Sequence, residues 1–298
     1  MFKHILVPLD GSNLSEASLV PAAYLAKTLK SQVTLLHIIE QGAPTEIHKE
    51  RHLTKPDEAD AYLKEASKRA FPTKVKVETH VHTAAVSDVA RSIVDHSAEL
   101  KPDLIVICAN GRSGVHDLLY GTIAQQVVAM GTIPLLVVKT KISSFELKKI
   151  LIPLDTDSMH DNSLGVAESL AKSFKTELHL LSIVPTLLTL GDEQAAASNL
   201  MPVTTLAYLD LKVENAKIDL QMHIDALHKG HFKATAEVAR GDPASVIVKT
   251  SKKSVSDMII LSTHRKAGMS AFWARSVAPK VAQKTKTPLL LIPLPQNN

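Results

Sequence analysis

The sequence predicts an α/β protein built from two similar doubly wound domains, each with a parallel sheet and helices on both of its faces. Short apolar runs rich in β-branched residues alternate with segments of helical spacing, which is typical of a parallel sheet whose strands are buried on both sides. The same order of segments occurs twice along the chain. At 298 residues, the chain is long enough for two domains of ordinary size, each with its own core.

The segment from Asp103 to Lys139 shows one repeating unit. A buried strand over Leu104–Ile107 leads into a polar loop with Gly111, and Gly121 and Thr122 then open a segment with helical apolar spacing, for which Thr122 suits the N-cap. The loop of such a βαβ unit lies where a strand ends and a helix begins, so unpaired backbone N–H groups can hold an anion there. Glycines at this separation also occur in ordinary turns, so the feature alone leaves both interpretations open.

The remaining elements of the first half follow from the same patterns. Apolar runs and alternation predict strands, helical spacing predicts helices, and one polar, charge-rich stretch acquires helical character towards its end. In chain order these are strand Ile5–Pro8, helix Ser15–Leu29, strand Val33–Ile39, the polar stretch Gln41–Arg69, strand Val75–His82, helix Asp88–Glu99 and the last strand, Leu135–Val138.

The second half repeats the first. Ile150–Asp155 repeats Ile5–Asp10 at an offset of 145 residues, and Asp257–Ile260 repeats Asp103–Val106 at an offset of 154. The difference of nine residues (154 minus 145) predicts an insertion, which we place in Thr186–Thr205. We therefore predict domains 1–142 and 148–298 that pack together as a pseudo-dimer. Because an edge strand needs pairing or cover, the expected contact is through the final strands, Leu135–Val138 and Leu289–Ile292.

The composition bears on the class of protein. Hydrophobic residues make up 45% of the chain and charged residues 21%, as in a soluble globular protein, while 4% aromatic residues are too few for a platform that stacks single-stranded nucleic acid. The net charge of +4 is spread along the chain, so nucleic acid is not an expected partner. The cytoplasm, away from membranes, is the expected compartment. It is favoured by the single cysteine, Cys108, by the lack of any apolar run of about 18 residues and by the lack of a signal-peptide pattern.

The sequence predicts neither a catalytic site nor a metal site. His80 and His82 share a strand face, and His48 and His52 share a helix face, but neither pair has the further ligands that a zinc site needs. Nucleophile-elbow and P-loop patterns are absent, and no residue pair suits general acid–base chemistry. We therefore expect a protein that is not an enzyme.

Both halves resemble the universal stress protein family over essentially the whole chain. In the first half the resemblance rests on ILVPLDGS, VTLLHII and the glycine loop that ends in Gly121 and Thr122; in the second it rests on ILIPLD, HLLSIV, the turn Gly241–Ala244 and MIILSTH. It implies a five-stranded parallel sheet in each domain. It also implies a pocket for ATP or a related adenine nucleotide, with or without Mg²⁺, at the carboxyl ends of the strands.

Nucleotide-binding members of the family carry Gly-x-x-Gly, nine further residues, and then Gly-Ser or Gly-Thr. Here Gly111 and Gly121-Thr122 match with nine residues between them, whereas Cys108 replaces the first glycine. An extended backbone would tolerate this cysteine and a positive φ would not, and its thiol is either inert or a redox sensor. The resemblance implies that Asp10 contacts the ribose or adenine and that Pro8, Leu9 and Ile38 border the base. It also implies that Ile107 and Cys108 lie at the strand end. The residues that it places at the phosphates are Asn110, Gly111, Gly121, Thr122 and Ile123.

The second half departs from this motif. Its corresponding positions are Asp155 and Ile183, which match Asp10 and Ile38, and Ser262, Arg265, Arg275 and Ser276 in place of the glycine motif. The two arginines could occupy the phosphate positions and close this degenerate site, or could remake it for another anion.

The resemblance implies a stress-response protein whose nucleotide, bound in the first domain, changes its interactions with other proteins. Those protein partners are not identified by the sequence, and a further homodimer is left open. Two alternatives remain: a slow ATP hydrolase or phosphotransferase, and an interaction scaffold without a ligand.

Overall fold

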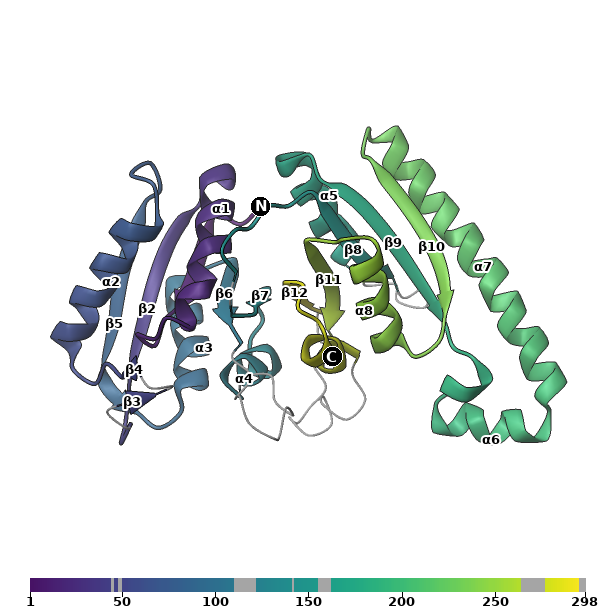
Figure 1. The fold of residues 1–298 in the computed structure, drawn as a ribbon, viewed down its shortest axis with the longest axis horizontal. Coiled ribbons are helices and arrows are strands. Elements are labelled where there is room, and N and C mark those ends of the chain that lie inside the picture. The colour runs from purple at the N-terminus through teal and green to yellow at the C-terminus, as the bar shows by residue number, and fades with distance from the viewer. Residues whose placement is uncertain are drawn as a thin grey trace. The chain divides into compact units, whose positions relative to one another are not determined.

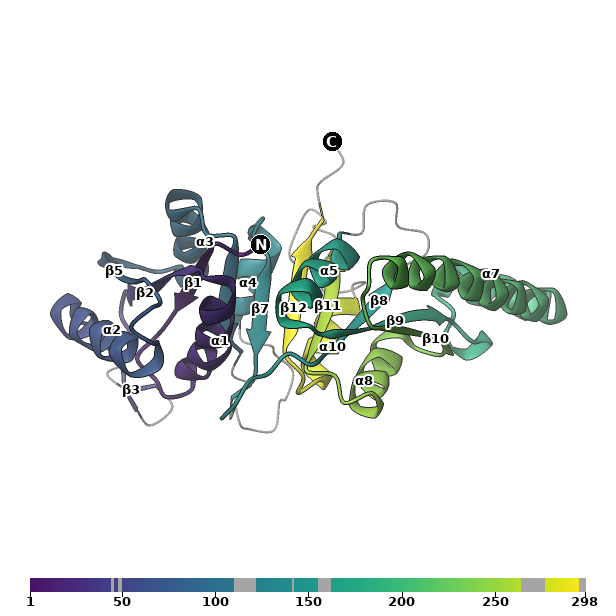
Figure 2. The ribbon, with the colours of Figure 1, turned by 90° about the horizontal axis from the view of Figure 1, so that it is seen from above.

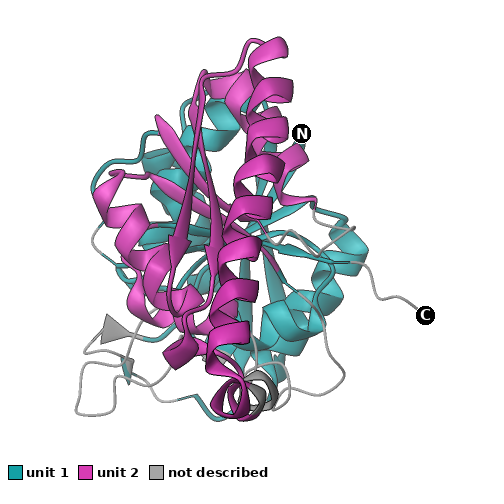
Figure 3. Cartoon of the chain, turned by 90° about the vertical axis from the view of Figure 1, so that its right-hand side faces the viewer, with its two compact units in different colours: residues 1–146, 263–275, 288–298 teal, residues 147–262, 276–287 magenta. Residues whose placement is uncertain are grey.

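Helices and strands alternate along the chain in the computed structural model (Figure 1). The structure describes residues 1–43, 46–47, 50–109, 122–140, 142–154, 162–263 and 277–294. By its internal contacts the chain divides into unit 1 (residues 1–146, 263–275 and 288–298) and unit 2 (residues 147–262 and 276–287), which Figure 3 colours separately. Within the described residues, no helix combines the length and the apolarity that crossing a membrane requires.

Unit 1 is organised around a parallel sheet of five strands in the order β7-β6-β1-β2-β5, as predicted. The strands are β1 (His4–Pro8), β2 (Gln32–Glu40), β5 (Val77–Val86), β6 (Leu104–Cys108) and β7 (Leu135–Val138). The inner strands are buried on both faces, and β2 contains seven consecutive buried residues. β12 (Leu289–Pro293) pairs with β7 in antiparallel orientation, with Leu290 opposite Leu136, which confirms the predicted pairing of the final strands.

Helices cover both faces of this sheet. α1 (Leu19–Leu29) packs against α2 (Pro56–Ala70), and α3 (Val89–Leu100) packs against α4 (Thr122–Met130); Figure 2 shows α2 and α3 on opposite sides of the strands. Asp88 caps α3 by accepting a hydrogen bond from the backbone N–H of Arg91 at 2.9 Å. The helix predicted from Ser15 begins as a 3-10 turn, η1 (Ser15–Ser18), in which serine hydroxyls donate to carbonyl oxygens three residues earlier.

Two predicted segments of unit 1 differ from the structure. The stretch predicted as polar with later helical character contains a short antiparallel pair, β3 (Glu46–Ile47) and β4 (Glu50–Arg51), before α2 begins. β5 extends to Val86, beyond the predicted end at His82, because it pairs along most of β2, with Val86 opposite Glu40. Pairing between strands therefore overrode the end of the apolar alternation.

Unit 2 repeats this plan with four parallel strands in the order β10-β9-β8-β11. They are β8 (Lys149–Leu154), β9 (Glu177–Val184), β10 (Ala234–Arg240) and β11 (Met258–Thr263). Its helices include α5 (Ser163–Phe174), α8 (Pro243–Lys253) and α10 (Val277–Lys284). Between β9 and β10 lie η2 (Leu187–Thr189), α6 (Asp192–Leu200) and α7 (Pro202–Lys229). α7 has 28 residues, whereas its counterpart α2 has 15, so this connection is longer in the second half.

The repeat is also visible in matching hydrogen bonds. The carboxylate of Asp103 accepts hydrogen bonds from the backbone N–H groups of Lys3 at 2.6 Å and His4 at 2.9 Å. The carboxylate of Asp257 does the same for residues 148 and 149, at 2.8 Å each. Each aspartate therefore joins the start of one parallel strand to the start of its neighbour, and both halves use the same contact to set that pairing.

Candidate functional site

The carboxyl ends of β7, β6, β1 and β2 meet at one edge of the sheet of unit 1, because these strands are parallel neighbours. Lys139 directly follows β7, Cys108 is the last residue of β6, and Asp10 comes two residues after β1. An amino group, a thiol and a carboxylate therefore follow one another along this edge, and Ile38 lies on the adjacent strand β2. Ligands of open α/β sheets bind at such an edge.

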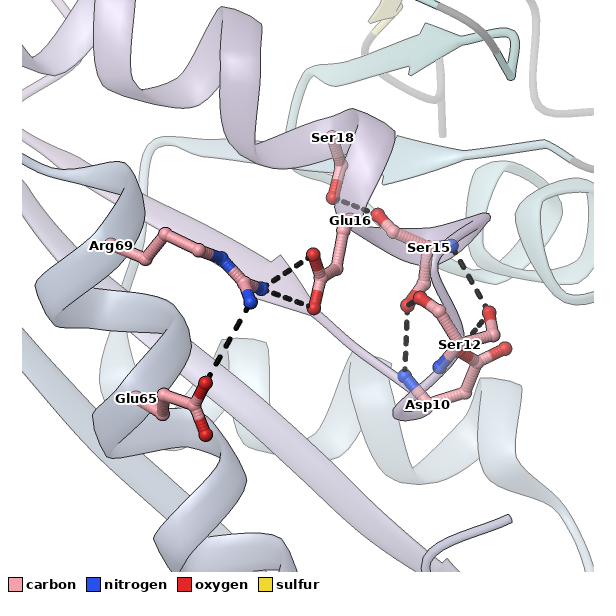
Figure 4. A network of polar contacts seen from close by, with 7 residues as sticks. All are labelled: Asp10, Ser12, Ser15, Glu16, Ser18, Glu65 and Arg69. Carbon is pink, nitrogen blue, oxygen red and sulfur yellow. Dashed lines mark hydrogen bonds and ion pairs between the residues drawn. The ribbon is translucent and has the colours of Figure 1, made fainter. Parts of the chain in front are cut away.

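The side chains of Asp10 and Ser12 hold the turn after β1 (Figure 4). Oδ1 of Asp10 accepts hydrogen bonds from the backbone N–H of Ser12 at 2.9 Å and from its hydroxyl at 2.6 Å, and Oγ of Ser12 accepts one from the backbone N–H of Ser15 at 3.1 Å. Gly11 has a φ of +92°, in the region that favours glycine. The Asp-Gly-Ser order therefore keeps the Asp10 carboxylate in place at the strand end.

An ion pair between Arg69 and Glu16 joins the neighbouring η1 to α2 (Figure 4). Nη2 of Arg69 lies 2.6 Å from both carboxylate oxygens of Glu16, and Nη1 of Arg69 lies 3.8 Å from Oε1 of Glu65. The guanidinium group is more than half exposed, so each pair stabilises the fold only slightly. The Arg69–Glu16 pair connects α2 to the segment that follows the Asp10 turn, whereas the Arg69–Glu65 pair lies within α2.

The backbone of Cys108 is extended. It lies in β6 opposite Val138 and is not among the described residues with a positive φ, so this position does not require glycine. Burial, and secondarily the carboxylate of Asp10, raise the pKa of the thiol to about 12, against a smaller opposing effect of Lys139. Because the thiolate is the reactive form, a protonated thiol favours the inert interpretation of Cys108 over the redox sensor.

Lys139 lies at the same edge of the sheet and was not among the predicted site residues. It is partly buried, and this burial lowers the pKa of its amino group, while Cys108 acts in the opposite direction. Cys108 lies opposite Val138, the residue before Lys139, and the thiol and the amino group act on each other electrostatically. The available signal was a lysine directly after a fully apolar strand, at the end where the other polar residues of the site also lie.

The β2 side of the edge is covered by the segment around β4. The ring of His37 lies between two carbonyl oxygens, with Nδ1 2.8 Å from Leu9 O and Nε2 3.1 Å from Leu53 O; a carbonyl only accepts, so a neutral ring donates to one of them at a time. The side chain of Leu53 lies 2.8 Å from the position that a Cβ would take at Gly11. Leu9 and Ile38, which were expected to border a base, are 4% and 7% exposed.

His52 lies in the same covering segment. Its ring centroid is 6.5 Å from that of His37, and burial lowers its pKa, opposed by the carboxylates of Asp10 and Glu40. Neither His37 nor Leu53 was predicted as a site residue, because their contacts join parts of the chain that no local pattern connects.

The other predicted site residues fall into three groups. Pro8 ends β1, Ile107 lies in β6, and Thr122 and Ile123 begin α4, where Ile123 is 37% exposed. In unit 2, Ile183 lies in β9 and Ser262 in β11. The positions outside the described residues are Asn110, Gly111, Gly121, Asp155, Arg265, Arg275 and Ser276.

Among the described residues, no group of three or more histidine, cysteine, aspartate or glutamate side chains could hold a metal ion. The structure therefore supplies no ligand set for a metal bound by protein side chains alone in that part of the chain.

Comparison with known proteins gives matches in both halves. The sequence model of the universal stress protein family matches residues 1–139 and 146–293. A universal stress protein of Methanocaldococcus jannaschii is 32% identical over 146 residues, which are 47% of this chain and 83% of that protein. One from Bacillus subtilis is 28% identical over 152 residues, covering 47% of this chain and all of that protein (100%).

A solved structure is similar over nearly the full length. The crystal structure of a universal stress protein from Archaeoglobus fulgidus covers 99% of this chain and 97% of its own, with a TM-score of 0.69 and 16% identity. At that identity the similarity establishes the fold alone.

Proposed function

This chain belongs to the universal stress protein family, and from that premise we propose that its first half, residues 1–142, binds ATP or a related adenine nucleotide. The ligand would lie at the carboxyl edge of β6, β1 and β2, where Asp10 and Cys108 stand side by side. Bound nucleotide would change how the protein interacts with protein partners in a stress response. We propose the cytoplasm as the compartment, because a single cysteine cannot form an internal disulfide.

The extended backbone of Cys108 is the observation that supports this proposal most directly. Cys108 replaces the first glycine of the family's nucleotide motif, and the replacement would be prohibitive if the position needed a positive φ. Because Cys108 pairs with Val138 as an ordinary strand residue, the cysteine fits without strain. The motif can therefore act through its remaining glycines, Gly111 and Gly121.

The residues of the edge have distinct roles in this proposal. Asp10 would accept hydrogen bonds from the ribose or adenine, and Pro8, Leu9 and Ile38 would border the base. The N–H groups at the start of α4 would face the phosphates, because a helix N-terminus attracts anions. Lys139 would add positive charge beside them, and Mg²⁺ would be bound mainly through the phosphates rather than by a protein cage.

The second half, residues 148–298, is proposed to bind no nucleotide. Ser262, Arg265 and Arg275 replace the motif glycines. The guanidinium groups of Arg265 and Arg275 would take the place of the phosphates. The expected stoichiometry is therefore one nucleotide per chain.

Isothermal titration calorimetry of the full chain with Mg-ATP tests the proposal. We expect one site per chain, weakened about tenfold or more by Asp10→Ala and abolished by Gly121→Arg, which would place a long side chain at the phosphates. Asp95→Ala, which removes an exposed carboxylate of α3, is the matched control and should leave binding unchanged. At 100 times the dissociation constant, ATP should stabilise the fold by about 2.7 kcal/mol.

Three outcomes would contradict parts of this scheme. Absence of binding at millimolar ATP would favour the ligand-free scaffold. Two sites per chain, one of which survives Asp10→Ala, would contradict the closed second site. Release of phosphate above a protein-free blank, lost in Asp10→Ala, would make the protein a slow hydrolase instead of a binding protein.

A further inference from the structure

The long helix α7 has apolar residues on two opposite faces. One face packs on β9 and β10 of its own unit, and its buried residues are Leu209, Ala216, Leu220, Ile224 and Leu227. The opposite face is solvent-exposed, with Tyr208 at 52% exposure, Leu211 at 58%, Ile218 at 61% and Met222 at 60%. At 3.6 residues per turn, this second set lies roughly half a turn away from the first, so it makes no contact with the sheet that α7 covers.

The exposed set has the spacing of a coiled-coil seam. Tyr208, Leu211, Asn215, Ile218 and Met222 are separated alternately by three and four residues; we call them the α7 stripe. This spacing repeats every seven residues and places Tyr208, Asn215 and Met222 at a positions and the other two at d positions. A single asparagine at an a position within an apolar seam fixes register and oligomeric state in paired helices.

The equivalent helix of unit 1 provides an internal comparison. α2 connects β2 to β5 as α7 connects β9 to β10, but the outer surface of α2 carries ion pairs at helical spacing, such as Lys64 with Asp60 at 2.6 Å and Arg69 with Glu65 at 3.8 Å. None of the exposed large apolar residues of the described chain lies on α2. The fold therefore does not require an apolar outer surface at this helix, and the α7 stripe needs a separate explanation.

Charges beside the stripe select the orientation of a partner helix. Lys212 and Asp219 flank it at e positions, Glu214 and Gln221 flank it at g positions, and the amino group of Lys212 lies 5.4 Å from the ring centroid of Tyr208. In a parallel pair, e faces g, so Glu214 would meet the partner's Asp219, which is a repulsive contact. In an antiparallel pair, e faces e, so Lys212 would meet the partner's Asp219, twice by two-fold symmetry.

We propose that the α7 stripe is a homodimer interface, in which α7 of a second copy of this chain packs in antiparallel orientation. A two-fold axis between Asn215 and Ile218 would bring Leu211 against the partner's Met222 and would leave the two Asn215 side chains within about one turn of each other. The stripe is thus complementary to itself in apolar pattern, in polar register and in charge. An anionic membrane surface is a poorer match, because acidic side chains flank the stripe where membrane-binding helices carry lysine and arginine.

Sedimentation velocity of the full-length chain over about 1 to 100 µM tests the interface. We expect a concentration-dependent dimer in the wild type and at least about tenfold weaker association in the double variant Leu211→Glu/Ile218→Glu. Both side chains are exposed, so the variant should retain the wild-type circular dichroism spectrum. Val203→Glu is the matched control, since Val203 lies on the same helix, is 79% exposed and is outside the stripe; it should dimerise as the wild type does.

A charge exchange tests the orientation. Lys212→Asp should weaken the dimer by placing like charges opposite each other, and adding Asp219→Lys should restore it. A chain that stays monomeric over the whole concentration range would overturn the proposal, as would a dimer that is insensitive to the Leu211→Glu/Ile218→Glu double variant. A monomer that binds vesicles containing anionic lipid through the stripe would overturn it as well.

Discussion

The reactivity of Cys108 gives the sharpest test of the geometry at the strand ends. Its thiol pKa of about 12 leaves about one molecule in 10⁴ as thiolate at pH 8, whereas an ordinary cysteine with a pKa of about 8.5 is about one-quarter thiolate. If the thiolate is the only reactive form, alkylation of Cys108 should be slower by about three orders of magnitude. The matched reference is Leu188→Cys in a Cys108→Ser background, because position 188 is 98% exposed.

The dependence of this rate on pH separates the pKa effect from simple shielding. The rate at Cys108 should still rise about tenfold per pH unit between pH 8 and 10, whereas the rate at the reference cysteine should level off above about pH 9. Asp10→Asn should accelerate the reaction, because the Asp10 carboxylate raises the pKa, and Lys139→Met should slow it. A Cys108 rate that levels off near pH 9, or one within about tenfold of the reference, would refute the placement of the thiol beside Asp10 in a buried setting.

Two substitutions and one change of pH test other contacts, each by urea denaturation. Gly11→Ala puts a Cβ 2.8 Å from Leu53 at a φ of +92° and should lower the free energy of unfolding by about 1–3 kcal/mol. Adding Leu53→Ala removes the contact but not the positive φ, so it should recover only part of this loss. Full recovery would contradict a contribution from backbone strain at residue 11. Asp103→Ala leaves two backbone N–H groups without their acceptor and should cost about 1–3 kcal/mol, so an unchanged midpoint would contradict the strand-joining role. Burial, and then His96, hold the pKa of His80 below 6.5. As the pH falls, His80 is therefore protonated in the unfolded chain before it is protonated in the folded chain. The free energy of unfolding should decrease below about pH 6.5, and it should decrease less steeply in His80→Gln. Two further histidines act in the same direction, His52 and His179.

The parts of the fold that the sequence predicts are those encoded by local pattern. Buried parallel strands such as β2 are continuous apolar runs, and a cap such as Asp88 stands directly before its helix, so each can be identified within a short window. The pairing of β7 with β12 could be inferred as well, because two strands in equivalent positions of a duplicated chain both need a neighbour.

The missed features depend on contacts between residues far apart in sequence. After β4 the chain returns to the strand ends, where the Leu53 side chain lies against Gly11 and the Leu53 carbonyl oxygen lies near His37. This return results from tertiary packing, and no periodicity around residue 50 predicts it. Lys139 joins the candidate site only because β7 lies next to β6, which brings its amino group within electrostatic reach of Cys108. A strand end shows which side chains meet there only once the order of the strands is known.

Comparison of the two halves shows where function is to be sought. Both retain the contacts that hold the fold, such as the aspartate before β6 and before β11 that binds the start of the neighbouring strand. Losing such a contact costs about 1–3 kcal/mol out of a total stability of about 5–15 kcal/mol, so neither half can give it up easily. The halves differ at the glycine motif and on the outer surface of the helix after the second strand, which is α2 in unit 1 and α7 in unit 2. Our two proposals rest on these differences: a nucleotide site in the first half, and an interface with a second copy of the chain along the α7 stripe.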